Sequence, residues 1–505
     1  MNGRKIRLIR NTFSSFAFQV ITVICGFILP KLILMFYGSE TNGLVSSIQQ
    51  FLQIIAFLEL GVGAVVKSAL YKPLAEKNDK KISEILASAN KFFRRLAYIL
   101  LGYVLILIAF YPYLTQNNSD RVATIILIAA MSISYFAQYY FGIVNQLLLT
   151  ADQKGYIQYN TQTITLIINT AACSGLIVCG MSIQVVKIVT SLIFLARPIV
   201  YKIYVNKHYN IDRHISYEGE PIKQKWNGIA QHVAAIVLDS TDIVVLTLFS
   251  TLTNVSVYYV YHMVVYGVKQ LFVSMTNGIQ SLLGELWAKK ETENLKSMFG
   301  WTEWCIHTGG VVLFGCTGLL ILPFVQIYTK GINDAEYVLP LFAFLITSAH
   351  AVHCLRIPYN TMILAAGHYK QTQSNYIISA VLNIVVSVVT VSLFGLIGVA
   401  IGTFVAMAYQ TVWMAWYVSK NLIKWPIKKF FRQIIVDVIT VALAFFATRW
   451  INLSDVSYLS FVIMAIEVFV VVLICVFVVN IILYRDKMLS LKTKVMLKIK
   501  KKKRV

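Results

Sequence analysis

The chain alternates long runs of apolar residues with short polar segments. A helix needs about 20 apolar residues to cross the hydrocarbon core of a bilayer. Fourteen runs are long enough, so we predict fourteen transmembrane helices. The predicted spans are residues 12–36, 43–71, 93–114, 121–149, 157–180, 182–204, 226–250, 254–284, 299–328, 335–365, 373–394, 396–419, 433–451 and 456–484.

The composition supports a membrane protein. Of the 505 residues, 58% are hydrophobic and only 13% are charged, about half the charged share of a soluble domain. This excludes a cytosolic enzyme, and the apolar content excludes a disordered or fibrous chain. The loops are too short to hold a nucleotide-binding domain, and no phosphate-binding glycine loop is present. We therefore expect an all-α polytopic membrane protein that is not an enzyme.

The positive charges predict how the helices are oriented. Of the 45 Lys and Arg residues, 36 lie on the side of the chain ends and only three on the other side. Such residues accumulate in cytoplasmic loops, which predicts an even number of spans with both termini in the cytoplasm. The bias explains the net charge of +23 without nucleic acid. The basic tail 485–505 is interpreted as a topology anchor, with anionic membrane lipids as its alternative partner.

Weak internal repeats suggest a duplicated unit. The alternative is chance similarity among apolar helices. Both units would enter the membrane in the same direction, because each has an even number of helices. The matching segments, at offsets of 212, 213 and 216, are 41–42 with 253–254, 75–82 with 288–295, and 149–154 with 365–370. The predicted organisation is a six-helix lobe 1–205, a cytoplasmic linker 206–225, a second six-helix lobe 226–420, two additional helices within 433–484, and the tail 485–505.

Several basic residues lie deep within the predicted spans. An ionisable side chain at the bilayer centre costs roughly 2.5–3.5 kcal/mol, so its usual role is functional. On the span 254–284, polar residues follow one line at 100° per residue. Helix–helix hydrogen bonding is the structural alternative for such a stripe. The candidate residues of a cationic substrate cavity are Arg356, Lys269, Lys67, His262, Tyr258 and Asn360.

Embedded acidic residues suggest a separate cation site. Asp239 and Asp242 are three residues apart, so they are neighbours on one helix. Oxygen ligands suit a hard cation such as Na⁺, and two carboxylates can also share H⁺. Asn383, on a polar face of the span 373–394, could complete the site. An ion pair with Lys269 and simple helix packing remain open alternatives. We expect no resident cofactor or metal, because the cysteines and histidines have no metal-ligand spacing.

Short motifs along the whole chain resemble a known family. They are Tyr-Gly-Ser-Glu-Thr-Asn-Gly at 37–43, Leu-Glu-Leu-Gly-Val-Gly at 58–63, Arg-Ile-Pro-Tyr-Asn at 356–360, Ala-Ala-Gly-His-Tyr-Lys-Gln-Thr at 365–372, and Asn383 followed by Gly-Leu-Ile-Gly-Val-Ala-Ile-Gly-Thr at 395–403. The chain resembles the Gram-positive polysaccharide flippases of the multidrug/oligosaccharidyl-lipid/polysaccharide exporter superfamily.

This resemblance implies a function and a mechanism. Such proteins move undecaprenyl-pyrophosphate-linked oligosaccharides from the cytoplasmic to the outer leaflet, for the synthesis of capsule, exopolysaccharide or cell-wall polysaccharide. Their two lobes form a MATE-like V around a central cavity with alternating access, and C-terminal helices in related flippases form a groove for the lipid tail. The implied partners are the lipid-linked oligosaccharide and the polymerase and glycosyltransferases of the same pathway.

Two other functions stay open at this stage. A multidrug cation antiporter of the same superfamily would use embedded carboxylates for cationic drugs, and it would raise drug resistance. A lipid scramblase would use no coupling ion, so neither a sodium nor a proton gradient would change its lipid movement. The buried cations favour the flippase, since Lys and Arg can replace the water around a pyrophosphate.

Overall fold

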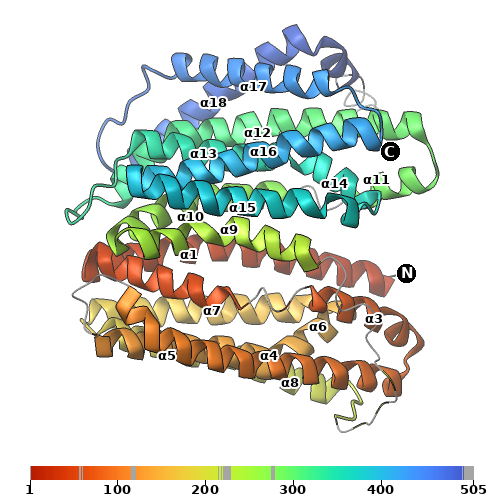
Figure 1. Cartoon of the computed structure of the whole chain (residues 1–505), viewed down its shortest axis with the longest axis vertical. Coiled ribbons are helices and arrows are strands. Elements are labelled where there is room, and N and C mark those ends of the chain that lie inside the picture. Colours follow the sequence, from red (N-terminus) through yellow and green to blue (C-terminus); the bar gives the residue numbers. More distant parts are fainter. Residues whose placement is uncertain are drawn as a thin grey trace. The chain divides into compact units, whose positions relative to one another are not determined.

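Figure 1 shows the computed structural model, which describes residues 2–55, 59, 61–114, 121–213, 215, 217, 219, 229–274, 279–491 and 493. Within these residues every regular element is a helix. Eleven helices are long and apolar enough to span a membrane, which confirms a polytopic all-α fold. The number fourteen is consistent with the structure, and it stays a prediction.

The contacts divide the chain into two compact units. The first unit consists of residues 1–259, 331–335 and 391–399. Its helices are α1 (Asn2–Gln53), α3 (Val62–Glu76), α4 (Asp79–Leu114), α5 (Arg121–Ala137), the π-helical segment η1 (Gln138–Gly142), α6 (Ile143–Ala151), α7 (Gly155–Val178), α8 (Ile183–His208), α9 (Ile229–Phe249) and the first turns of α10 (Leu252–Ser274).

The second unit contains the rest of α10 and the remaining helices. They are α11 (Ile279–Ala288), α12 (Thr292–Tyr328), α13 (Pro340–Leu355), α14 (Ile357–Ala365), α15 (Tyr369–Phe394), α16 (Leu396–Asn421), α17 (Ile427–Ala447) and α18 (Tyr458–Leu483), with the end of α15 and the first residues of α16 counted in the first unit. The boundaries 1–205 and 226–420 of the predicted six-helix lobes stay a prediction.

No loop separates the predicted span 12–36 from the start of the predicted span 43–71. Both belong to α1, which is kinked at Gly38, whose φ is +83° and ψ is 175°. An L-residue with a side chain rarely adopts this conformation, so glycine is required there. The first part of the second span ends with α1 at Gln53, and its last part belongs to α3, which begins at Val62. Residues 56–58 and 60 lie outside the described residues.

Two further irregularities interrupt membrane helices. Between α5 and α6, the five residues of η1 form a π-helical turn. Between α13 and α14, the helix is interrupted at Arg356, two residues before Pro358. Proline lacks the backbone N–H and clashes with the preceding turn, so it explains the second interruption. Such places in a helix are frequent at functional sites.

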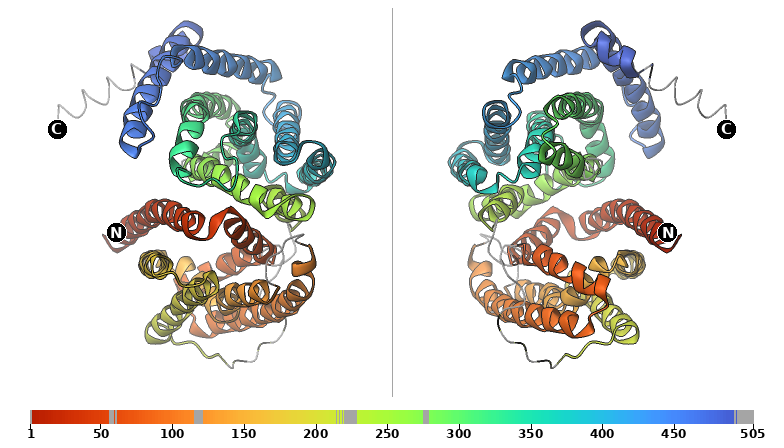
Figure 2. Two further views of the ribbon diagram at one scale, coloured as in Figure 1. Left: turned by 90° about the vertical axis from the view of Figure 1, so that its left-hand side faces the viewer. Right: turned by 90° about the vertical axis from the view of Figure 1, so that its right-hand side faces the viewer.

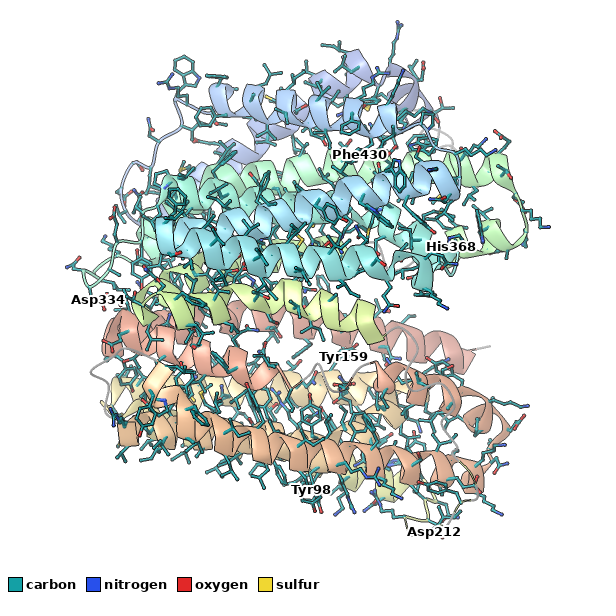
Figure 3. All side chains as sticks on the ribbon, viewed as in Figure 1. Tyr98, Tyr159, Asp212, Asp334, His368 and Phe430 are labelled. Atoms are coloured by element: carbon teal, nitrogen blue, oxygen red, sulfur yellow. The ribbon has the colours of Figure 1, made fainter. Side chains whose placement is uncertain are left out.

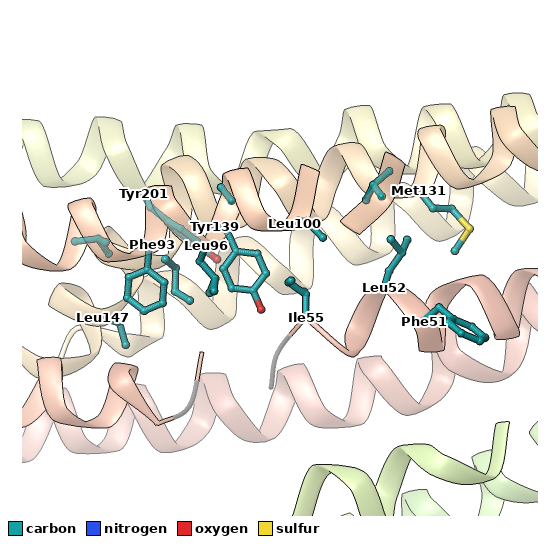
Figure 4. Close-up of a cluster of buried hydrophobic side chains, with 14 of the residues drawn as sticks. Phe51, Leu52, Ile55, Phe93, Leu96, Leu100, Met131, Tyr139, Leu147 and Tyr201 are labelled. Carbon is teal, nitrogen blue, oxygen red and sulfur yellow. The ribbon is translucent and has the colours of Figure 1, made fainter. Parts of the chain in front are cut away.

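The first unit has a large apolar core, part of which is drawn in Figure 4. Phe51, Phe93, Leu100 and Tyr201 are buried together there, although they come from different parts of the chain. A chain of hydroxyl groups also crosses this unit. The hydroxyl of Tyr111 donates to Ser47 Oγ at 2.8 Å, and the hydroxyl oxygens of Ser47 and the α9 residue Thr247 are 2.6 Å apart. Hydrogen bonds of this kind join helices in membranes.

In the second unit, α17 and α18 pack against each other and against α12, as two further views show (Figure 2). Val311, Ala444, Val468 and Val472 form a small apolar core there. The outer faces of both helices carry exposed apolar side chains, which stand out along the ribbon in Figure 3. A surface of this kind suits lipid rather than water.

Candidate functional site

Lys269 and Arg356 both lie in the second unit, and their role in a cationic substrate cavity stays a prediction. Both side chains are buried. Lys269 lies on α10, and Arg356 occupies the interruption between α13 and α14. Both act electrostatically on His353. The sequence therefore identified two cations that the fold places around one histidine, although they are far apart along the chain.

Aromatic and polar rings surround these two cations. The ammonium of Lys269 lies 5.4 Å from the ring centre of Tyr266, within cation–π range. The guanidinium Nη2 of Arg356 is 3.1 Å from Nδ1 of His353. Because a guanidinium can only donate, this nitrogen of His353 is the acceptor. We call Lys269, Arg356, His353 and Tyr266 the cationic cluster.

Two histidines extend the cationic cluster. The ring of His262 stacks on Tyr266 with 5.2 Å between the ring centres, and it meets His350 edge-on at 5.7 Å. His350 Nδ1 is 3.0 Å from the backbone carbonyl of Ile346. His262 thus lies beside the cluster, as the polar stripe predicts. His350 and His353 were not among the predicted cavity residues, although His353 is three residues, about one helical turn, from both His350 and Arg356.

The other predicted cavity residues have different surroundings. Asn360 accepts a hydrogen bond from the Tyr376 hydroxyl at 2.5 Å. In the first unit, the Tyr258 hydroxyl donates to Asp242 Oδ2 at 2.7 Å. Lys67, on α3, is half-buried and acts electrostatically on Glu59.

The predicted coupling-ion residues are only partly described. The side chain of Asp239 lies outside the described residues, although its backbone is part of α9. Asp242 is buried, with Tyr258 as a donor to its carboxylate. Asn383 is fully buried on α15, and its amide donates to Thr403 Oγ1 at 3.1 Å. Among the residues that the structure describes, no group of three or more His, Cys, Asp or Glu could hold a metal ion.

A second polar site lies where α12 meets α17 and α18. Here Nδ1 of His307 is 2.5 Å from Oδ2 of Asp437, and the Trp304 indole donates to Asn480 Oδ1 at 2.7 Å. We call this group, with the neighbouring Gln433, the α12–α17 polar site. In the sequence, the residues of the α12–α17 polar site are isolated polar positions within apolar runs. Their contacts in the fold could therefore not be predicted.

Glu303, one turn before His307, is held by several donors. The hydroxyl of Tyr359 donates to it, and the Trp425 indole donates at 2.9 Å to Oε2. Lys487, beyond the end of α18, donates to the carbonyl of Gly300 at 2.5 Å. Burial lowers the pKa of Lys487 to about 8, while the Glu303 charge opposes this shift. The charged side chains of Glu303 and Lys487 thus both lie at the N-terminal part of α12.

No protein-family model matches the chain, and no curated protein matches it significantly. Solved structures do match. A structure described as lipid II flippase MurJ in an inward closed conformation aligns with a TM-score of 0.69 at 15% identity, covering 95% of this chain and all of that one. The chain therefore shares the fold of that structure.

Two transporters of the MATE family align less completely. An inward-facing multidrug resistance MATE family transporter of the MOP superfamily has a TM-score of 0.59 at 14% identity, over 79% of this chain and 94% of that one. A mutant form of the Vibrio cholerae MATE transporter VcmN has a TM-score of 0.58 at 11% identity, over 84% of this chain and all of that one. These similarities establish a MATE-like and MurJ-like fold.

Proposed function

We propose that the protein is a flippase of the MOP superfamily that moves undecaprenyl-pyrophosphate-linked oligosaccharides across the bacterial plasma membrane. The oligosaccharide would pass from the cytoplasmic to the outer leaflet by alternating access, for the synthesis of a surface polysaccharide. The observation that carries this proposal is the fold similarity to a lipid II flippase over 95% of the chain. The motif resemblance to Gram-positive polysaccharide flippases supports the same substrate class.

The two helices α17 and α18 favour a lipid-linked substrate. The MATE structures cover 79–84% of the chain, whereas the lipid II flippase covers 95%. Helices α17 and α18 form the last part of the described chain, and their outer faces are apolar. A polyprenyl tail needs an apolar surface to follow while its headgroup crosses, and these two helices supply one.

The cationic cluster suits a pyrophosphate headgroup. A pyrophosphate leaving water must exchange its hydration for other donors, and Arg offers paired N–H groups that match phosphate oxygens. Arg356 and Lys269 are such donors, buried among helices. Tyr266 adds an aromatic face of the kind on which a sugar ring packs. We propose that Lys67, Tyr258, His262 and Asn360 also bind the substrate.

Reconstituted protein tests this function directly. A fluorescent undecaprenyl-pyrophosphate oligosaccharide would be supplied on one side of proteoliposomes, and its protection from a membrane-impermeant quencher measured with time. Wild-type protein should move it, and Arg356→Ala and Lys269→Ala should each slow it roughly 10–100-fold, the loss of one charge-assisted hydrogen bond. Lys31→Gln is the matched control, since Lys31 is half-buried on α1. Equal rates in protein-free vesicles and in vesicles that hold the protein would refute the proposal.

A multidrug cation antiporter is the second candidate. The similarity to MATE transporters supports it, as does the buried carboxylate of Asp242. Buried cations at Lys269 and Arg356 would repel a cationic drug, which argues against it. Expression in a drug-sensitive bacterium distinguishes the two, because only the antiporter should raise resistance to cationic compounds. An uncoupled scramblase would instead move lipid in both directions without any ion gradient.

We further propose that transport is coupled to Na⁺ or H⁺, with Asp239 and Asp242 binding the cation and Asn383 contributing to coupling. The motivating feature is a pair of carboxylates one turn apart on α9.

Both termini and the basic tail would face the cytoplasm, as the bias of positive charge predicts. Anionic membrane lipids, a polysaccharide polymerase and glycosyltransferases are the proposed partners.

A further inference from the structure

Three basic side chains gather at one end of the packed helices α12, α17 and α18. Lys429 and Arg432 lie in the first turns of α17, and Lys487 follows the last residue of α18 by four positions. Burial is the largest cause of the lowered pKa of Lys487, Glu303 opposes this shift, and the charge of Lys429 adds to it. The two ammonium groups are therefore close enough to repel each other. We call Lys429, Arg432 and Lys487 the α17–α18 basic site.

Uncharged groups hold the two cations of α17 in place. The ammonium of Lys429 lies 3.9 Å from the ring centre of Trp425, and the guanidinium of Arg432 lies 5.5 Å from that of Tyr484. Both distances are within cation–π range. Nη2 of Arg432 also donates to the carbonyl of Leu483 at 3.2 Å. These contacts position the two charges without neutralising them.

The nearby acids do not balance the basic residues. Segments 424–437 and 483–487 contain six Lys and Arg residues and only two acids, Asp437 and Asp486. Asp437 is paired with His307. The buried Glu303, on α12, already accepts hydrogen bonds from Tyr359 and Trp425. Positive charge is thus in excess at this end of the helices, which attracts an anion.

Aromatic residues place the α17–α18 basic site at the membrane surface. The ammonium of Lys487 lies 5.9 Å from a ring centre of Trp301 and 5.6 Å from one of Trp304. Trp425 and Tyr484 add two more amphipathic rings beside the other cations. Tryptophan and tyrosine are enriched where a membrane meets water. The three cations therefore lie at the depth of lipid headgroups.

An exposed apolar row on α17 begins beside this site. Ile435 is 59% exposed and Ile439 is 46% exposed. They follow Arg432 by three and seven residues, so the three side chains share one face of the helix. A lipid whose headgroup contacts Arg432 has this row along which to pack an acyl chain.

We propose that the α17–α18 basic site binds the phosphate of an anionic phospholipid, with an acyl chain along Ile435 and Ile439. Arg432 uses one N–H group on Leu483, and a guanidinium has five. The phosphate would also offset the repulsion between Lys429 and Lys487. The proposal gives the anionic lipid a defined place on α17 and α18, apart from the basic tail and from the cationic cluster. It requires that the helices span a membrane, and it does not depend on transport.

Photocrosslinking of the full-length protein in phosphatidylcholine nanodiscs tests this site. A trace of phosphatidylglycerol with a diazirine in its acyl chain is added, and labelled residues are mapped by mass spectrometry. The peptide that holds Ile435 and Ile439 should be labelled more by this probe than by its phosphatidylcholine analogue. Lys429→Gln and Arg432→Gln should each lower the excess about fivefold, the usual contribution of one basic residue at a membrane surface.

Two further variants separate charge at the site from other effects. Lys420→Gln is the matched control, since Lys420 is an exposed lysine 5.1 Å from the ring centre of Trp416, and it should leave the labelling unchanged. Lys429→Arg keeps the charge and should also retain it. Labelling by the phosphatidylcholine probe should be the same in every variant, which shows that the face of α17 is still folded.

Three results would overturn the proposal. One is equal labelling of this peptide by the two probes in wild type. Another is an equal loss in Lys420→Gln and in the two glutamine variants of the site, which would mean that only general surface charge attracts the lipid. The third is displacement of the probe by inorganic phosphate at constant ionic strength, which would mean that the site binds a free anion rather than a lipid. Because these measurements do not involve transport, a failure here is distinct from a failure of the proposed function.

Discussion

One carboxylate, that of Asp334, binds Ser39 through two hydrogen bonds. The Ser39 backbone N–H donates to Oδ2 at 2.7 Å, and its hydroxyl donates to Oδ1 at 2.6 Å. Ser39 directly follows the kink at Gly38, and Asp334 lies in the loop that joins α12 to α13. The loop therefore fastens the second part of α1 at the point where its backbone turns.

The two hydrogen bonds between Ser39 and Asp334 should contribute measurably to the stability of the folded protein. Asp334→Ala should lower the free energy of unfolding by about 1.5–3 kcal/mol, the contribution of hydrogen bonds to a charged group. Ser39→Ala combined with Asp334→Ala should cost less than the sum of the single changes. Thermal unfolding of the purified protein in detergent measures both. Glu336→Ala is the control, since Glu336 is an exposed acid in the same loop.

The kink itself gives a second prediction. Gly38→Ala should destabilise the protein by about 1–3 kcal/mol, because alanine is strained at this φ and its Cβ would lie 2.9 Å from Asp334 Oδ2. Gly26→Ala is the matched control on the same helix, since a Cβ there meets nothing within 4 Å. If the two variants unfold at the same temperature, the kink is not a constraint of the folded state.

A third prediction concerns charge at position 269. If positive charge attracts the substrate, Lys269→Arg should retain more transport than Lys269→Gln in the proteoliposome assay. Loss of one charge-assisted hydrogen bond should slow the glutamine variant roughly 10–100-fold. Equal activity of the two variants would mean that side-chain length or packing, rather than charge, matters at this position.

The fourth prediction concerns the coupling ion. The membrane potential alone favours outward movement of an anion by about 2.3 kcal/mol per charge per 100 mV. If Asp239 and Asp242 bind the coupling cation, changing both to Asn should abolish the response of transport to that ion's gradient. The sodium and proton gradients are varied separately, at fixed potential. A double variant with the full wild-type response would show that coupling occurs elsewhere.

Lys487 provides a prediction on pH. Burial holds its pKa at about 8, below the usual value near 10.4. Between these values the unfolded chain binds a proton that the folded protein has released, so this residue makes stability rise as pH increases through that window. Lys487→Met should lose this contribution. Unfolding temperatures from about pH 7 to 10 measure it, with the exposed Lys428→Met as the control.

The features that could be predicted from the sequence are those that depend on one helix alone. Lys269 and Arg356 stand out because a charge within an apolar run is costly, wherever its partners lie. Helical periodicity places His262 and Lys269 on one line of α10, and in the fold each lies against the ring of Tyr266. The fold class followed from the lengths of the apolar runs, which eleven described helices bear out.

Contacts between distant helices could not be predicted in this way. His307 and Asp437 are 130 positions apart, and nothing in their local sequences indicates that α12 and α17 pack together. Gly38 was interpreted as part of the connection between two spans, and the residue after this kink is held by Asp334, 295 positions away from it. Asn360 was predicted as a cavity residue, and the sequence did not indicate that the Tyr376 hydroxyl donates to it.

Trp425, which lies just before α17, limits how this helix can move against α12. Trp425 is bound through its indole N–H to the buried Glu303, and its ring occupies space that a Cβ at Gly300 would enter, 2.6 Å from Cη2. At the opposite end of α12, Lys330 donates to the carbonyl of Val456 in an exposed hydrogen bond, which water can replace at little cost. Near this exposed bond the rings of Phe324 and Phe461 lie 5.7 Å apart, and α12 shares an apolar core with α17 and α18. The three helices are therefore joined at both ends, and they should move through lipid as one body rather than swing against each other.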